Sequence, residues 1–296
     1  MSISGHRFEN ALCGLADGSE VKGTFPVCRA QIYANLKASI RLIFFLTFAA
    51  VLVVAAFLMM PAKNFFGLKS DVLMSHFVSF FCRLTLKLIG IKVEANSLPE
   101  IADRRGSIIV ANHISYVDAL VLNGYYRAKF VTSEEIASSH GLGTLTKAGG
   151  CAFVERRQKM RLRKDVAEIS RYLAEGRTVM FFPEGSTGPG QPLLPFKSSL
   201  FEAAMRTGAG VFVFSVSYPV VDGESIDQLA NDKIAWYGDM TFFPHMWNML
   251  KLNQSVCQLS FLGKIRPMTS GGRKCLTQTV VAMIEQNLRV SRSGGD

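Results

Sequence analysis

The stretch that decides the fold is Asn-His-Ile-Ser-Tyr-Val-Asp, residues 112–118. It follows the apolar run Ser-Ile-Ile-Val-Ala, residues 107–111, which is typical of a buried strand. The Ser-x-x-Asp spacing from Ser115 to Asp118 then predicts the start of a helix. His113 is therefore expected on a strand-to-helix turn, where its side chain can point into a cleft.

The spacing of His113 and Asp118 allows two interpretations. On one regular helix the two side chains would point about 140° apart, but across a turn the carboxylate can reach the imidazole. A carboxylate on one ring nitrogen fixes the tautomer and leaves the other nitrogen as a base. In the alternative, Asp118 belongs only to a helix cap and His113 is a hydrogen-bonded loop residue. The rest of the chain favours the first interpretation.

The composition favours a membrane-associated protein. The chain has 296 residues, enough for one sizeable domain and an appendage. Hydrophobic residues make up 49% of it, the mean hydropathy is +0.22 and the formal net charge is +10. A basic balance suits nucleic acid or an anionic membrane surface, and the apolar excess favours the membrane. The 6 cysteines lack paired or metal-ligand spacing, which predicts reduced thiols facing the cytosol.

The clearest membrane signal is the uncharged run 42–60, which Pro61 follows. A helix of this length spans about 28 Å, close to the hydrocarbon thickness of a bilayer. A signal peptide is the competing interpretation, but no small-x-small cleavage site follows the run. A buried core helix is disfavoured because the run has no polar face. The pattern predicts a membrane-inserted helix over residues 39–61 and a mobile tail over residues 1–38.

A second apolar segment, residues 71–91, carries Arg83 and Lys87 one helical turn apart. This pattern predicts a helix in the membrane interface within residues 62–97. A helix that packs on the protein is the alternative. Basic residues flank the first apolar run on both sides, so they leave the orientation in the membrane open.

From about residue 98 the pattern changes to alternating strands and helices. The expected strands are 107–111, 128–132, 151–155, 178–182, 211–218 and 256–262. The expected helices are 116–126, 158–175, 197–207 and 273–289. This alternation predicts an α/β domain over residues 98–290, with a mixed, largely parallel sheet flanked by helices. A short mobile tail, residues 291–296, is expected to follow.

Three further stretches carry residues suited to binding an anion or a hydroxyl. One strand ends at Arg156, whose guanidinium can form forked hydrogen bonds with a phosphate. Another runs into a turn with exposed backbone donors that contains Glu184, Gly185 and Ser186; a solvated surface turn is the alternative. Lys197 is expected in the first turn of a helix, where free N–H groups also favour anions. The sequence is equally compatible with a structural role for Lys197.

In combination these stretches resemble the bacterial 1-acylglycerol-3-phosphate acyltransferases of the glycerolipid acyltransferase family, over roughly residues 70–265. Residues 112–118 match the family's block Asn-His-x-Ser-x-x-Asp. Residues 150–156 resemble its second block, and residues 182–186 resemble its block Phe-Pro-Glu-Gly-Thr/Ser. Residues 208–218 lie where the fourth block lies. One such block is a weak signal, but several in the right order are a strong one.

Two features depart from the family's pattern. Gly210 and Val213 stand where the fourth block usually carries prolines. Thr187 stands where phosphatidate-forming members often carry Arg. Both departures leave the reaction type intact and bear on the identity of the acceptor.

The resemblance implies a membrane-bound O-acyltransferase that needs neither a metal nor a cofactor. It would move a fatty acyl group from acyl-CoA or acyl-carrier protein to the free hydroxyl of a lysophospholipid. The expected acceptor is 1-acyl-glycerol-3-phosphate, giving phosphatidate, and lyso-ornithine lipid or another lysolipid is the alternative. The expected catalytic pair is His113 and Asp118. The expected substrate-binding residues are Arg156, Glu184, Gly185, Ser186 and Lys197.

The expected location is the bacterial inner membrane, with the catalytic domain facing the cytoplasm and no nucleic-acid partner. Other classes fit less well. A serine hydrolase would carry Gly-x-Ser-x-Gly, a spacing that Gly-Ser-Thr-Gly at residues 185–188 lacks. A nucleic-acid binder would account for the charge but not for the apolar run. A non-catalytic membrane scaffold is the third alternative.

Overall fold

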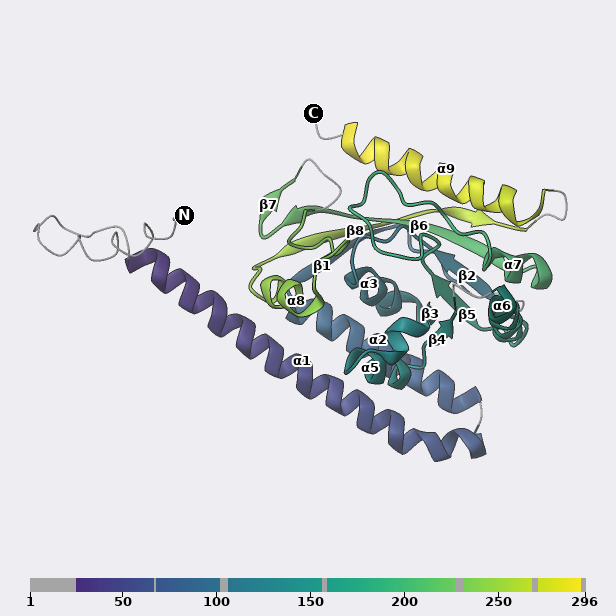
Figure 1. The fold of residues 1–296 in the computed structure, drawn as a ribbon, viewed down its shortest axis with the longest axis horizontal. Helices are drawn as coiled ribbons and strands as arrows, with labels where there is room; N and C mark the ends of the chain where they lie inside the picture. Colours follow the sequence, from purple (N-terminus) through teal and green to yellow (C-terminus); the bar gives the residue numbers. More distant parts are fainter. Residues whose placement is uncertain are drawn as a thin grey trace, which may run out of the picture.

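The computed structural model describes residues 25–66, 68–101, 106–155, 159–226, 231–267 and 271–293. These residues form an 8-stranded sheet in the order β1-β8-β6-β2-β5-β3-β4, with β7 paired to β6 (Figure 1). The strands are β1 (Ile91–Asn96), β2 (Ser107–Val110), β3 (Lys129–Ser133), β4 (Ala152–Val154), β5 (Thr178–Phe181), β6 (Gly210–Val221), β7 (Glu224–Ser225) and β8 (Ser255–Ile265).

The sheet is mixed and largely parallel. The pairs β1·β8, β6·β2, β2·β5, β5·β3 and β3·β4 are parallel, whereas β6 is antiparallel to β8 and β7. Every residue of β2 is buried, as expected for a strand covered by helices on both faces. The fold class predicted from the sequence, an α/β domain with helices on a mixed, largely parallel sheet, is confirmed.

The helices form a layer on each face of the sheet. They are α1 (Phe25–Phe66), α2 (Leu68–Leu88), α3 (Val117–Tyr126), α4 (Glu134–Ser138), α5 (Leu142–Ala148), α6 (Lys159–Ala174), α7 (Phe201–Thr207), α8 (Phe242–Leu250) and α9 (Gly272–Ser293). The connection from β2 to β3 crosses the sheet in one direction, and those from β4 to β5 and from β5 to β6 cross it in the other. Because such crossovers are right-handed, α3 covers one face and α6 and α7 cover the other.

The crossovers create a crevice at the carboxyl ends of two neighbouring strands. The chain leaving β2 turns to the face of α3, whereas the chain leaving β5 turns to the face of α7. Ligands of open α/β sheets bind at such a switch point. Residues 111–116 enter this crevice from β2, and residues 182–188 enter it from β5.

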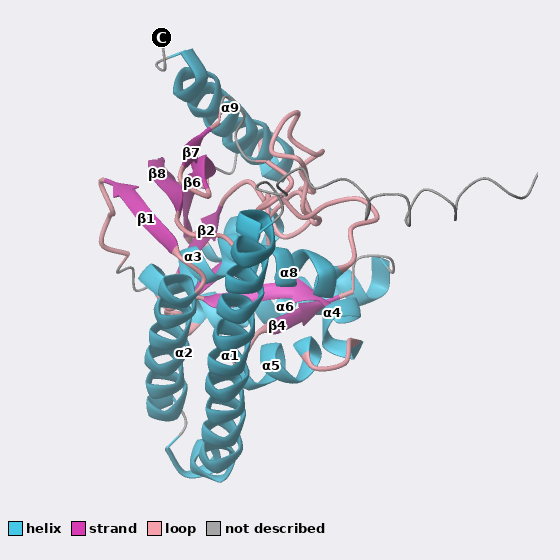
Figure 2. Ribbon diagram, turned by 90° about the vertical axis from the view of Figure 1, so that its left-hand side faces the viewer, coloured by secondary structure: helices cyan, strands magenta, loops and turns pink. Residues whose placement is uncertain are grey.

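The first two helices run side by side as an antiparallel hairpin that extends away from the sheet (Figures 1 and 2). Helix α1 is fastened to the domain through Arg41, whose guanidinium donates hydrogen bonds to the carbonyl oxygens of Leu250 at 3.0 Å and Leu252 at 2.6 Å. Ala38 and Leu52 of α1 are buried in this contact layer. The hairpin therefore belongs to the folded unit and forms one wall of it.

The outward faces of the hairpin are apolar. Among the described residues, the helical stretch Arg29–Met59 is long and apolar enough to cross a membrane, and little of it is buried in the protein. The exposed apolar side chains of the two helices include Ile32, Leu36, Ile43, Phe44, Leu46, Val54, Phe57, Leu58, Val72, Leu73 and Phe80. An exposed apolar surface of this extent marks a site of contact with another apolar phase.

Two expectations for the first helix are wrong. Residues 25–38 lie in α1 rather than in a tail, while residues 1–24 lie outside the described residues. The helix also continues past Pro61 to Phe66. A proline removes a single backbone hydrogen bond, and the rest of a 42-residue helix propagates cooperatively around that loss.

Other boundaries also move. The sheet starts at β1, before the expected boundary at residue 98, because Ile91 and Val93 alternate with Lys92 and Glu94 in a strand that pairs with β8. At the other end α9 continues to Ser293, past the expected boundary at residue 290. Helices α4, α5 and α8, which have 5, 7 and 9 residues, were not predicted because so few turns give weak periodicity.

Candidate active site

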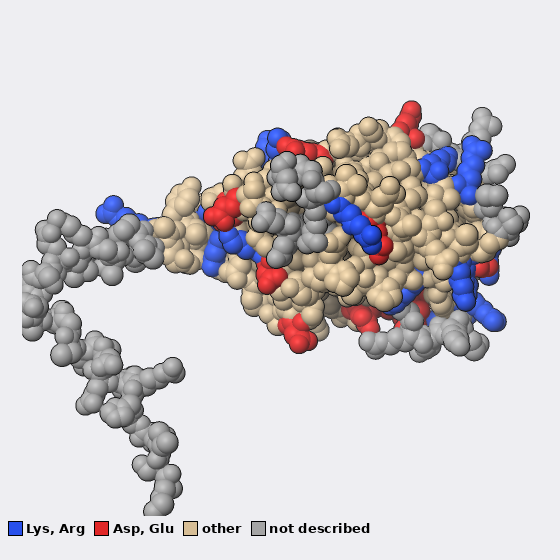
Figure 3. All heavy atoms as spheres, turned by 90° about the horizontal axis from the view of Figure 1, so that it is seen from above, with Lys and Arg blue, Asp and Glu red and all other residues tan. Residues whose placement is uncertain are grey.

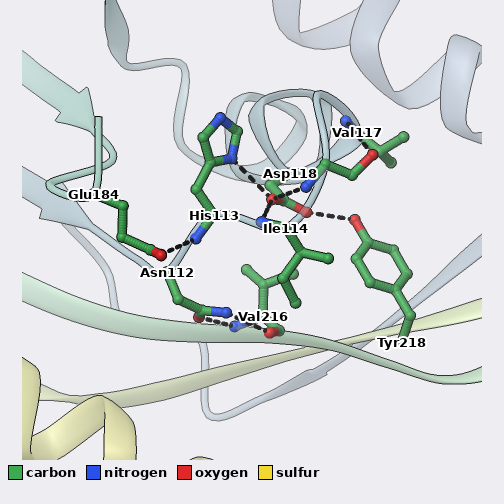
Figure 4. Close-up of polar contacts among 9 residues, drawn as sticks. Asn112, His113, Ile114, Val117, Asp118, Glu184, Val216 and Tyr218 are labelled. Carbon is green, nitrogen blue, oxygen red and sulfur yellow. Dashed lines mark hydrogen bonds and ion pairs between the residues drawn. The ribbon is translucent and has the colours of Figure 1, made fainter. Parts of the chain in front are cut away.

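The centre of the site is the carboxylate of Asp118, which is fully buried. Its Oδ2 atom accepts hydrogen bonds from the backbone N–H of Ile114 at 2.7 Å and of Ser115 at 2.8 Å. The same oxygen lies 3.0 Å from Nδ1 of His113 (Figure 4). The carboxylate therefore reaches the imidazole across the turn, as the first interpretation of the His-x4-Asp spacing predicted, and it also orders the turn. Helix α3 has no side-chain cap, so the alternative, in which Asp118 is only a cap residue, is wrong.

The imidazole of His113 is held on two sides. Its ring stacks on Phe182, with 3.8 Å between the ring centroids and 5° between the planes. The Asp118 carboxylate accepts a hydrogen bond only from a protonated nitrogen, so the contact assigns the proton to Nδ1. The side chain of His113 is 14% exposed, and Nε2 faces away from Asp118 (Figure 4). This geometry leaves Nε2 as the basic atom of the pair.

The carboxylate of Glu184 connects the two sides of the crevice. Its Oε1 accepts a hydrogen bond from the backbone N–H of His113 at 2.6 Å, and its Oε2 accepts one from Leu194 at 2.9 Å. Burial raises the pKa of this carboxyl to about 7, although the two amide hydrogen bonds act in the opposite direction. We expected Glu184 to bind the substrate head group. Both of its oxygens instead hold backbone, so it orders the turn that carries His113.

Asn112 extends the ladder between β2 and β6 past the end of β2. Its side-chain amide donates a hydrogen bond to the carbonyl oxygen of Val216 at 2.9 Å. The amide oxygen accepts one from the Val216 N–H at 2.8 Å. The Asn112 side chain thus takes the place of a backbone partner where β2 leaves the sheet. These two hydrogen bonds fix Asn112, which directly precedes His113.

The His–Asp pair opens onto a mostly apolar cavity of about 400 Å³. Beside His113 its lining is polar and comes from Gly185, Ser186 and Thr187. The remaining lining is mostly apolar and comes largely from both long helices and from α3, α5 and α8; it includes Phe45, Leu52, Phe81, Cys82, Leu120, Leu145, Trp236, Phe242 and Met246. The cavity is therefore polar at the imidazole and apolar toward the hairpin.

The remaining expected site residues differ in their outcome. Arg156 lies outside the described residues. The ammonium of Lys197 lies beside Gly185. A side chain on that glycine would collide with it, because an added Cβ atom would stand 3.0 Å from Nζ. Lys197 does not begin a helix, because its N–H donates to the carbonyl oxygen of Pro183 at 2.8 Å and α7 starts only at Phe201. The structure thus brings Lys197 next to the turn that contains Gly185 and Ser186.

Two residues of the site were missed from the sequence. Phe182 supports the imidazole through the ring stacking, and its place next to the Pro-Glu-Gly turn was a usable signal. The phenol of Tyr218 donates a hydrogen bond to Oδ1 of Asp118 at 2.6 Å. It lies 100 residues from Asp118, and no spacing rule connects the two.

The fold and the site define an α/β protein with a buried His–Asp pair at the polar end of an apolar cavity. Residues 90–219 match the protein-family model described as Acyltransferase. This part of the chain, which carries His113, Asp118 and Glu184, is therefore similar to the acyltransferase family.

Two curated relatives that the chain resembles are named as acyltransferases. The chain is 34% identical over 57% of its length to the lyso-ornithine lipid O-acyltransferase of Rhizobium meliloti (strain 1021), covering 60% of that protein. It is 29% identical over 53% of its length to the 1-acyl-sn-glycerol-3-phosphate acyltransferase of Neisseria gonorrhoeae, covering 59% of that protein. The matches thus span about three fifths of the two relatives' own length.

The crystal structure of the 1-acyl-sn-glycerophosphate acyltransferase PlsC from Thermotoga maritima has a similar fold. The TM-score is 0.63 at 17% sequence identity, and the superposition covers 88% of this chain and 95% of that chain. At this identity the likeness shows that the fold is shared.

The bridge formed by Glu184 generates a prediction. Glu184→Gln keeps the size of the side chain but turns one acceptor oxygen into an N–H donor, which would oppose the N–H of His113 or Leu194. Leaving such a buried donor unpaired costs about 1–3 kcal/mol. We therefore expect a lower melting temperature and lower turnover. The control is Glu202→Gln, because the carboxylate of Glu202 contacts arginine side chains at the surface.

The pKa of Glu184 adds a second readout. A folded-state pKa near 7, above the ordinary 4.5, means that the folded protein binds the proton more tightly than the unfolded chain. The free energy of unfolding should therefore fall as pH rises through this interval. The Gln variant should lack that fall in denaturant titrations across the interval. A variant with unchanged stability and an unchanged pH slope would contradict the bridging role.

Proposed function

We propose that the chain is a membrane-bound O-acyltransferase that moves a fatty acyl group from a thioester donor to the free hydroxyl of a lysolipid. The observation that carries the proposal is the His113–Asp118 pair at the polar end of an apolar cavity of about 400 Å³. A base beside an apolar cavity suits a substrate that carries a hydroxyl close to a fatty chain. The acyltransferase-family match of residues 90–219 supports the same reaction.

In the proposed reaction, Asp118 holds the tautomer of His113 in which Nε2 is unprotonated. Nε2 removes the proton of the acceptor hydroxyl while the hydroxyl oxygen bonds to the thioester carbonyl carbon. The carbon–sulfur bond then breaks, and the departing thiolate takes the proton back from Nε2. A thiolate is a good leaving group, so the reaction needs no acyl-enzyme. The proposed donor is acyl-CoA or acyl-carrier protein.

The head group of the acceptor would lie at the polar end of the cavity. Ser186 and Thr187 line this end together with His113. Lys197 adds a positive charge beside Gly185. Arg156 stays a predicted phosphate-binding residue, on the strength of the family resemblance.

Lyso-ornithine lipid is the acceptor that we favour. The relative from Rhizobium meliloti, with 34% identity, is named for this activity, whereas the lysophosphatidate enzyme of Neisseria gonorrhoeae is 29% identical. Thr187 lines the cavity and offers a hydroxyl where phosphatidate-forming members often carry a guanidinium. This reverses the order of the two acceptors expected from the sequence alone. Lysophosphatidate stays the second candidate, supported by the cationic Lys197.

The proposed location follows from the apolar outward face of the α1–α2 hairpin. The cavity reaches Phe45 and Leu52 of α1 and Phe81 of α2, so a fatty chain could enter from the bilayer. We propose that the hairpin inserts into the bacterial inner membrane and that the sheet domain lies on its cytoplasmic side.

One prediction of the proposed function concerns the base. His113→Ala should lower the rate of acyl transfer by about 10²–10⁴-fold, as is typical of a lost general base. The rate is measured with purified protein, labelled acyl-CoA and a panel of lysolipids. His140→Ala is the matched control, because His140 is an exposed loop residue. Near-normal turnover of folded His113→Ala protein would refute the assignment.

Another prediction concerns the acceptor. Initial rates should be higher with lyso-ornithine lipid than with lysophosphatidate. Thr187→Arg should lower the Michaelis constant for lysophosphatidate roughly ten- to hundredfold, because a hydrogen bond to a charged group contributes about 1.5–3 kcal/mol. Thr187→Gln, which adds length without charge, is the control. Faster acylation of lysophosphatidate by the unmodified protein would overturn our choice of acceptor but not the acyltransferase proposal.

A further prediction concerns the membrane. The full chain should stay with membranes in 1 M salt, where the Debye length is only about 3 Å. Aspartate at Phe57 and Leu58, which are 73% and 67% exposed, should weaken this retention. The matched control is Val290→Asp on α9, which is 61% exposed. Helix α9 lies at the top of Figure 1, and the face seen from above in Figure 3 carries both acidic and basic side chains, unlike the apolar outward face of the hairpin. Release of the unmodified protein by salt alone would contradict insertion of the hairpin.

A further inference from the structure

Tyr218 is a site residue that lies outside the His-x4-Asp motif. It is fully buried on β6, and its phenol donates a hydrogen bond to Oδ1 of Asp118 at 2.6 Å (Figure 4). The other carboxylate oxygen, Oδ2, accepts from His113, Ile114 and Ser115. The two oxygens of Asp118 therefore have separate partners, one from the sheet and the others from the turn after β2.

The arrangement meets the physical requirements of a buried anion. A carboxylate without water stays ionised only if hydrogen-bond donors replace its hydration. Short bonds from an O–H group to an ionised acceptor are among the strongest available. The position of the phenol is set by its neighbours on β6, because the Asn112 side chain bonds the backbone of Val216 and Ser217 pairs with Gln258 of β8.

We propose that Tyr218 is a positioning residue for acyl transfer: it holds Oδ1 of Asp118 so that Oδ2 points at Nδ1 of His113. The inference rests on the proposed function, because it assigns Tyr218 a part in the same reaction. Tyr218 does not line the cavity with His113, so it would act through Asp118 rather than on the substrate.

The groups around the phenol keep it a donor. Burial raises the pKa of Tyr218 well above its usual range, and the nearby Asp118 charge acts in the same direction. The thiol of Cys257 on β8 forms a hydrogen bond with the same phenol, and burial raises the pKa of that thiol as well. The titratable groups that face Asp118 are therefore His113, Tyr218, Cys257 and, on the β5 side, Glu184.

A purely structural role for Tyr218 is the alternative, and the pH profile distinguishes the two. Without the phenol, the charge on Asp118 would be less stabilised, so the carboxylate and the adjacent imidazolium would both hold a proton more tightly. Tyr218→Phe should therefore shift the acid limb of kcat/KM to higher pH, by roughly half a unit or more. It should also lower kcat about three- to thirtyfold, with the KM for the lysolipid unchanged.

The matched control is Tyr126→Phe. Tyr126 lies on α3, and its ring packs on Phe214 of β6 with 5.2 Å between centroids. This change should leave the pH profile and kcat as they are. Unmodified protein that acylates none of the lysolipids would refute the proposed function itself. Active unmodified protein with the same pH profile and kcat in Tyr218→Phe would overturn the inference alone.

A second variant tests the inference if Tyr218→Phe folds poorly. Site-specific 3-fluorotyrosine at position 218 keeps the ring and the hydroxyl but makes the phenol a stronger donor. The acid limb should then shift in the opposite direction, to lower pH. A loss of thermal stability with no shift of the acid limb in either variant would show that the phenol is structural only, and it would overturn the inference.

Discussion

The burial of one carboxylate organises this protein. Asp118 has no exposed surface, and its oxygens accept hydrogen bonds from His113, Ile114, Ser115 and Tyr218. Because a buried anion must have its donors in place, the turn after β2 and the middle of β6 are held in one arrangement. The position of the imidazole follows from that arrangement, and with it the chemistry that we propose.

A second carboxylate completes the crevice from the β5 side. Glu184 binds the backbone N–H of His113 and of Leu194, and the Asp118 charge is among the causes that raise its pKa to about 7. The two acids thus hold the backbone around one histidine, Asp118 through the N–H groups of Ile114 and Ser115 and Glu184 through that of His113. A carboxyl group with a perturbed pKa, such as Glu184, is common at catalytic sites. Here Asp118 is the partner of the imidazole, and Glu184 holds the turn.

The sequence was informative where structure is set locally. The alternation of strand and helix patterns predicted the mixed sheet, because each segment's pattern depends on its own residues. The His-x4-Asp spacing predicted the contact between His113 and Asp118, because the two residues lie on one short turn. Contacts that depend on strand order were not predictable. Tyr218 reaches Asp118 only because β6 lies next to β2, and the role of Glu184 depends on how the chain returns at Leu194. The length of α1 was underestimated at both ends, because residues 25–38 were taken as a tail and Pro61 was taken as the helix end.

The central claim is that Asp118 fixes the tautomer of His113 and leaves Nε2 as the base. Nitrogen-15 NMR of detergent-solubilised protein labelled at its 5 histidines measures this directly. The His113 signals are assigned by their loss in His113→Gln. The account predicts that, above the pKa of the imidazole, Nδ1 of His113 carries the proton and Nε2 shows the shift of an unprotonated nitrogen. A proton on Nε2 with Nδ1 unprotonated would contradict it.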